Sequence, residues 1–257
     1  MPTSSPQNPN AKVAVIGGTG MNQWPGLEIL ESVVVDTPYG APSAPLLKGR
    51  IAGIDAIFLA RHGEGHKIPP HAINYRANLW ALQAAGVAKV IAIGAVGSIA
   101  EWFAPGEVAV PNDVIDYSWG REHTYSDGRP GSELKHIEFE HPYAPALRAA
   151  LLAAAKAAAV DAHDGGTMAV TQGPRLESPA EIRRLKQDGC AMVGMTGMPE
   201  AALAAELGLA YACLAVSVNW APGIGSGDIH GQIEHWIATS MAKVRAILAA
   251  ALPGLAS

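Results

Sequence analysis

Three side chains able to bind an anion follow an apolar run in the first quarter of the sequence. The run AIFLA (residues 56–60) ends at Arg61 and His62, and His66 follows four residues after His62. An arginine offers a planar fork of donors that suits phosphate, and imidazoles add hydrogen-bonding groups near neutral pH. Open α/β sheets bind ligands at the carboxyl ends of their strands. The position therefore favours an oxyanion site, with a surface cluster of salt bridges as the alternative.

A zinc site is a second alternative for the two histidines. His62 and His66 have a spacing seen in metal sites, but no HExxH pattern is present and two glycines between them oppose a helix. We therefore expect no metal here. The two cysteines, Cys190 and Cys213, each lie in an apolar run and are expected to be buried, reduced thiols.

A glycine-rich turn, IGGTG (residues 16–20), follows the first apolar run. Its glycines let backbone N–H groups approach an anion, and Thr19 adds a hydroxyl donor. A dinucleotide-binding fold is an alternative, because Asp36 ends the next apolar run. However, the third glycine of G-x-G-x-x-G is missing, and a Trp-Pro-Gly sequence interrupts the helix that should follow. Taken alone, the motif fits a tight turn without a ligand equally well.

These candidate residues lie within an alternation of short apolar runs and longer helical patterns. The order predicts an α/β fold: one domain over residues 11–257, with a mixed, mostly parallel central sheet flanked by helices. Residues 117–143 form an irregular region too long for an idle loop, so we expect it to be functional or covered by a partner. The predicted strands are 12–16, 32–36, 54–60, 89–93, 167–171, 191–195 and 210–218, and the predicted helices are 72–85, 145–160, 179–188, 199–207 and 232–252.

Composition narrows the class of protein further. Hydrophobic residues make up 49% of the 257 residues and charged residues only 16%, so the solvated surface is small or another copy of the chain covers part of it. A net charge of −5 does not favour nucleic-acid binding. Residues 1–10 are polar and proline-rich, which indicates a disordered tail rather than a signal peptide. No uncharged apolar stretch reaches about 18 residues, so we expect no membrane span and a cytoplasmic location.

Several segments together resemble the trimeric purine nucleoside phosphorylase and methylthioadenosine phosphorylase family. They are LARHGEGH, NYRANLWAL, GAVGSI, TQGPRLES, VGMTGMPEAALAAELGL and VSVN, together with IGGTG and TPYGAPSAPL. The match is most similar to the bacterial branch acting on S-methyl-5′-thioinosine or other 6-oxopurine nucleosides. The resemblance implies a pentosyltransferase in which phosphate attacks the ribosyl C1′ and a purine leaves. It also implies a homotrimer, phosphate as a co-substrate and no other cofactor.

The resemblance assigns roles to particular residues. Asn219, Arg61 and His62 would act in catalysis. Asn219 would face the purine N7 and O6, Ala221 replaces an aspartate of the adenine-type pattern, and Glu177 would accept from the N1–H of a 6-oxopurine. The phosphate-binding set would be Thr19, Arg61, His62, Gly94, Ala95 and Thr196.

The remaining assignments concern the sugar and its 5′ group. Met195 would lie beneath the ribose, and Leu176 would wall the base pocket. His230 would lie near the 5′ substituent, where a histidine favours a hydroxyl over a methylthio group. His136 would reach the 5′ pocket of a neighbouring subunit. Alternatives are a methylthioadenosine phosphorylase, an NAD(P)-dependent oxidoreductase and a non-catalytic nucleoside-binding protein.

Overall fold

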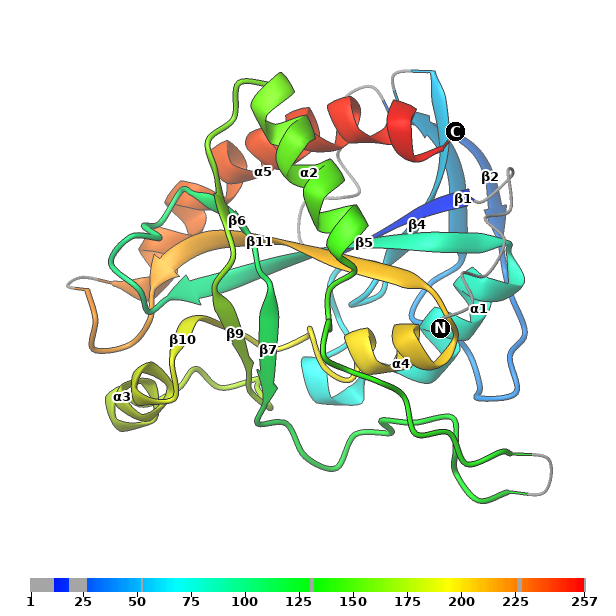
Figure 1. Ribbon diagram of the computed structural model, residues 1–257, viewed down its shortest axis with the longest axis horizontal. Helices are drawn as coiled ribbons and strands as arrows, with labels where there is room; N and C mark the ends of the chain where they lie inside the picture. Colours follow the sequence, from blue (N-terminus) through cyan, green and yellow to red (C-terminus); the bar gives the residue numbers. More distant parts are fainter. Residues whose placement is uncertain (1–11, 19–26, 52, 130–131, 226–227, 257) are drawn as a thin grey trace.

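The sheet is organised around one long strand, β5 (Val87–Ser98), in the computed structural model of the protein (Figure 1). It pairs in parallel with β1 (Lys12–Gly17) and β11 (Ala210–Trp220), and its last two residues pair antiparallel with β10 (Cys190–Gly194). The structure describes residues 12–18, 27–51, 53–129, 132–225 and 228–256. The predicted tail, residues 1–10, lies outside them.

The other strands extend this sheet on both sides. Among the described residues, six strand pairs are parallel and four antiparallel, which confirms the predicted mixed, mostly parallel sheet. The remaining strands are β2 (Leu27–Val33), β3 (Leu46–Ile51), β4 (Ile54–Ala60), β6 (Val108–Val110), β7 (Asp113–Asp116), β8 (Ala162–Asp164) and β9 (Thr167–Val170).

The edge of the sheet departs from the sequence prediction. A strand was predicted at 32–36, but β2 spans Leu27–Val33, and the prediction omitted β3. β2 is a largely exposed edge strand in which apolar and acidic residues do not alternate cleanly, and β3 carries Lys48, Gly49 and Arg50. Neither segment has the apolar pattern of a buried strand, so only its pairing defines it.

Helices cover the two faces of the sheet (Figure 1). α1 (Tyr75–Ala84) and α4 (Glu200–Glu206) pack on one face, whereas α2 (Pro145–Ala157) and α5 (Ile229–Leu255) pack on the other. α3 (Pro179–Gln187) packs beside β10, and a 3-10 turn spans Pro70–Ala72. All five predicted helices are present.

Helix ends follow the expected chemistry. Gly86 and Gly208 adopt positive φ angles of 84° and 70° just beyond α1 and α4, where a residue without Cβ is favoured. Pro179 is the first residue of α3, as predicted. Pro199 instead precedes α4 as its N-cap, so that prediction was wrong by one residue.

Among the described helices, α5 alone has the length and composition to cross a membrane. Val244, Ile247 and Leu248 on this helix are nevertheless fully buried in the core cluster that also contains residues of β11 and α2. This packing is that of a core helix. It also brings the first turns of α5 beside the carboxyl end of β11.

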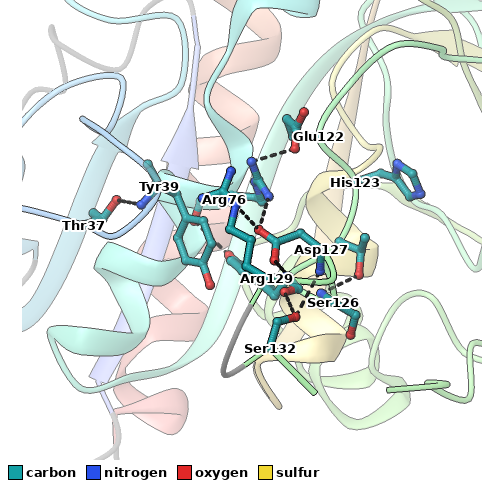
Figure 2. Close-up of polar contacts among 12 residues, drawn as sticks. Thr37, Tyr39, Arg76, Glu122, His123, Ser126, Asp127, Arg129 and Ser132 are labelled. Atoms are coloured by element: carbon teal, nitrogen blue, oxygen red, sulfur yellow. Dashed lines mark hydrogen bonds and ion pairs between the residues drawn. The ribbon is translucent and has the colours of Figure 1, made fainter. Parts of the chain in front are cut away.

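The irregular region is held against α1 by charged and polar contacts. The guanidinium of Arg76 in α1 lies 2.6 Å from a carboxylate oxygen of Glu122 and 3.4 Å from one of Asp127, as Figure 2 shows. The central carbon of this guanidinium, Cζ, lies over the ring of Tyr39, 5.1 Å from the ring centroid. Within residues 117–129 and 132–143 no helix or strand occurs. The described part of the region is therefore an irregular segment anchored to α1, and its predicted role, functional or covered by a partner, stays a prediction.

Candidate active site

A cavity of about 470 Å³ lies where β1, β4, β10 and β11 end and where β5 continues past β1. Loops that follow strands form about half of its wall, as expected for a site at the carboxyl ends of strands in an α/β sheet. An apolar wall comes from α5. Nine of the predicted site residues line this cavity: Arg61, His62, Gly94, Ala95, Leu176, Glu177, Met195, Thr196 and Asn219.

Four predicted site residues are placed differently or lie outside the description. Ala221 is buried behind the wall, and its N–H donates to the carbonyl of Ser98 at 2.8 Å. His136 and His230 are exposed and do not line the cavity. Thr19 lies outside the described residues. The roles assigned to these four residues stay predictions.

Arg61, the most buried polar side chain of the cavity wall, belongs to an ion pair that the sequence analysis missed. Arg61 and Glu200 have side chains only 2% and 0% exposed. The Nε and Nη2 atoms of Arg61 each donate to a carboxylate oxygen of Glu200 at 2.7 Å, and Tyr211 Oη donates to the same carboxylate at 2.9 Å. The available signal was a glutamate within the apolar segment MPEAALAA, where a charge needs a buried partner.

This pairing determines what Arg61 offers a ligand. Burial lowers the pKa of Arg61, but the charge and hydrogen bonds of Glu200 outweigh that effect and raise it above its ordinary value. A third donor, Nη1, reaches the carbonyl of Ile93 at 2.9 Å. Of the five N–H groups of a guanidinium, one on each terminal nitrogen is not used by these contacts. Arg61 is thus a rigidly held cation with two donors left for an anion.

His62 is constrained to one tautomer. Its Nδ1 lies 2.8 Å from the carbonyl oxygen of Ile68, which can only accept, so Nδ1 carries the proton. Burial, assisted by the nearby Arg61 charge, lowers the pKa of His62 to about 4. The ring also stacks on His66 with a centroid distance of 4.1 Å. At neutral pH, Nε2 therefore presents a lone pair and suits a protonated phosphate oxygen.

We expect His62 to remain neutral at pH 5.5, with Nδ1 protonated. The measurement is a ¹⁵N NMR titration of the histidine rings, with His62 assigned by comparison with His62→Asn. In the unfolded chain, the His62 ring takes up its second proton and becomes cationic near pH 6.5, whereas in the folded state it does so only near pH 4. Lowering the pH from 6.5 towards 4 should therefore progressively destabilise the folded state through this residue. A midpoint at or above 6.5 would contradict the assignment.

Two further buried polar side chains of the cavity are Glu177 and Asn219, 8% and 5% exposed. Thr171 Oγ1 donates to the Glu177 carboxylate at 2.5 Å. Asn219 Nδ2 donates to the carbonyl of Trp220 at 2.7 Å, which leaves its Oδ1 and a second N–H available. Their lining neighbours include Val193, Val216 and Val218. A few oriented polar groups on an apolar wall are typical of a site that binds a small molecule.

The sequence matches one protein-family model over almost its whole length. The family model described as the phosphorylase superfamily matches residues 12–253. The chain belongs to the phosphorylase superfamily. This result confirms the resemblance seen in the sequence, and the site can be compared with those of purine nucleoside phosphorylases. It gives no support to the dinucleotide-binding interpretation of the glycine turn.

Individual relatives of this superfamily align over most of the chain. A probable S-methyl-5′-thioinosine phosphorylase of Xanthomonas campestris is 52% identical over 216 residues, covering 84% of this chain and 86% of that protein. A probable 6-oxopurine nucleoside phosphorylase of Dictyoglomus turgidum is 41% identical over 243 residues, covering 94% and 91%. The structure of methylthioadenosine phosphorylase from Schistosoma mansoni in complex with tubercidin has a TM-score of 0.88 and 31% identity, covering 95% and 92%.

Proposed function

We propose that the protein catalyses phosphate-dependent cleavage of the N-glycosidic bond of 6-oxopurine nucleosides, with S-methyl-5′-thioinosine preferred. The observation that carries this proposal is one cavity lined by both an anion-binding pair, Arg61 and His62, and a base-reading pair, Glu177 and Asn219. A protein that only bound nucleosides would have no use for the first pair.

The reaction needs only alignment and charge stabilisation. A phosphate oxygen forms a bond to C1′ while the bond from C1′ to purine N9 breaks. The electron pair of the broken C1′–N9 bond moves into the purine. Arg61 and His62, with Thr196 and the backbone at Gly94 and Ala95, hold the phosphate for this attack. Asn219 stabilises the departing purine by accepting from a protonated N7 and donating to O6. The products are the free base and a ribose 1-phosphate.

Glu177 gives the preference for 6-oxopurines. An ionised carboxylate accepts a hydrogen bond from the N1–H of hypoxanthine or guanine, whereas adenine has a lone pair at N1. A buried site built to make this hydrogen bond discriminates strongly, because the wrong base leaves its polar group without a partner. This contact argues against the methylthioadenosine alternative, although structures of that enzyme share the fold.

The apolar side chains of α5 in the cavity wall favour a substrate with a methylthio group at the 5′ position. Ile233, Ile237 and Met241 line the cavity, whereas His230, one to three turns earlier on the same helix, does not. Apolar side chains suit sulfur and methyl better than a hydroxyl, which would be left without a partner. The substrate preferences in the names of the 52%-identical relatives agree with this choice.

The same proposal includes properties that support the reaction. Inorganic phosphate is the co-substrate, and no metal or organic cofactor takes part. The active form is a homotrimer located in the cytoplasm. Exposed apolar side chains in the irregular region, Trp119 at 72% and Leu134 at 75%, favour coverage by a second copy.

Kinetics with four nucleosides tests the function. With saturating phosphate, we expect kcat/KM to fall in the order S-methyl-5′-thioinosine, inosine or guanosine, then S-methyl-5′-thioadenosine. Without phosphate, cleavage should be lost, since water is a poor substitute for the aligned anion. Equal cleavage with and without phosphate would refute phosphorolysis. Preference for the adenine nucleoside would refute the base assignment alone.

A further inference from the structure

A buried arginine outside the cavity, Arg121, connects two chain segments that carry residues of the cavity. Arg121 lies in the irregular region, is 8% exposed and forms no ion pair within the described part of the chain. A buried cation is costly unless hydrogen bonds replace its water. Here backbone carbonyls replace it.

The guanidinium of Arg121 donates to carbonyls of two separate segments. Nη2 reaches Thr171 O at 3.1 Å and Gln172 O at 2.9 Å. Nη1 reaches Met195 O at 2.9 Å and Met198 O at 2.5 Å. Nε donates to the side-chain oxygen of Gln172 at 3.2 Å. One planar group therefore ties together two chain segments that are more than twenty residues apart.

Each of these segments carries part of the proposed site. Thr171 donates its hydroxyl to Glu177, so the first segment supports the base-reading carboxylate. The second segment contains Met195 and Thr196, which line the cavity, and leads directly into Glu200, which holds Arg61. A shift of either segment would change the distance between the base-reading and anion-binding groups.

We propose that Arg121 is a positioning residue that fixes the separation between the base-reading and phosphate-binding segments. The proposal rests on the proposed function for its consequence in catalysis. A lysine cannot replace it, because an ammonium has three donors on one atom and cannot span four carbonyls arranged around a planar fork. The role is geometric, because Arg121 does not line the cavity.

Arg148 supplies a matched control. Its guanidinium also donates to two backbone carbonyls, those of Pro111 at 2.8 Å and Val110 at 2.9 Å, and its side chain is only 16% exposed. It does not line the cavity. Arg148→Lys therefore removes the same type of guanidinium–carbonyl contact without touching the proposed site.

The experiment compares Arg121→Lys with Arg148→Lys at a temperature where both are folded, as judged by circular dichroism. For Arg121→Lys we expect kcat/KM for the preferred 6-oxopurine nucleoside to fall about 10- to 100-fold, because small misplacements of reacting groups are costly. The ratio of 6-oxopurine to adenine nucleoside turnover should fall as well. Arg148→Lys should retain both values. Equal kinetics of the two folded variants would overturn the proposal.

Hydrogen exchange provides a readout that does not depend on the reaction. In Arg121→Ala, faster amide exchange should appear in both residues 171–177 and 195–198, and added guanidinium at non-denaturing concentration should restore protection and activity. If exchange rises throughout the protein, or in neither segment, the positioning role is refuted. If the wild-type protein cleaves no nucleoside with phosphate, the proposed function fails while this result still decides the role of Arg121.

Discussion

Replacing Glu200 by glutamine is expected to destabilise the protein by about 3–5 kcal/mol and to raise the KM for phosphate more than the KM for the nucleoside. The substitution keeps the size of the side chain but leaves the Arg61 guanidinium buried without a counter-charge. Removing one partner of a buried ion pair carries this cost because the other charge stays desolvated. Glutamine keeps one acceptor oxygen but places an N–H group against the other Arg61 donor, so Arg61 would lose one of the two hydrogen bonds that hold its guanidinium in place.

The exposed pair Arg50–Asp55 provides the control for Glu200. It has a similar distance, 2.8 Å, but its side chains are 41% and 73% exposed. Asp55→Asn should therefore cost far less stability than Glu200→Gln and leave phosphate kinetics unchanged. Urea denaturation gives the free energies of unfolding, and initial rates at varied phosphate give KM. If Glu200→Gln matched Asp55→Asn in both measurements, Glu200 would have no role in holding Arg61.

Replacing Glu177 by glutamine should lower kcat/KM for 6-oxopurine nucleosides by at least about 100-fold, with a much smaller loss for adenine nucleosides. The carboxylate accepts one hydrogen bond from Thr171 and has capacity left for the N1–H of the base. A glutamine keeps one oxygen but adds an N–H group, which repels N1–H and tolerates the lone pair of adenine. The ratio of kcat/KM for 6-oxopurine nucleosides to kcat/KM for adenine nucleosides should therefore fall, and the preference can reverse.

Glu181→Gln is the appropriate control for this specificity change. Glu181 lies four residues from Glu177, but its side chain is 44% exposed, pairs with Arg175 and does not line the 470 Å³ cavity. Glutamine at this position also preserves the capping box with Ser178. Its kinetics should equal those of the wild type. An unchanged 6-oxopurine to adenine ratio in Glu177→Gln would remove Glu177 from base recognition.

Local sequence determined much of this protein. The apolar runs and helical periodicities predicted the α/β class, the mostly parallel sheet and all five helices, because burial on one or both faces leaves a pattern within a few residues. Arg61 and His62 were recognisable because their type and their place after a strand are also local. The family motifs then pointed to Glu177 and Asn219, and the structure places both on the cavity wall.

Tertiary structure decided the contacts between distant segments. Glu200 pairs with Arg61 across 139 residues, and no periodicity links the two. Arg121 was missed because four of its acceptors are backbone carbonyls, which have no residue type to recognise. His230 precedes Ile233 and Ile237 by three and seven residues and so shares their face of α5; it is left out of the cavity lining by the place of the helix's first turn, which only the folded chain defines. Which face of an element meets the cavity depends on packing, and packing is settled only when the whole chain has folded.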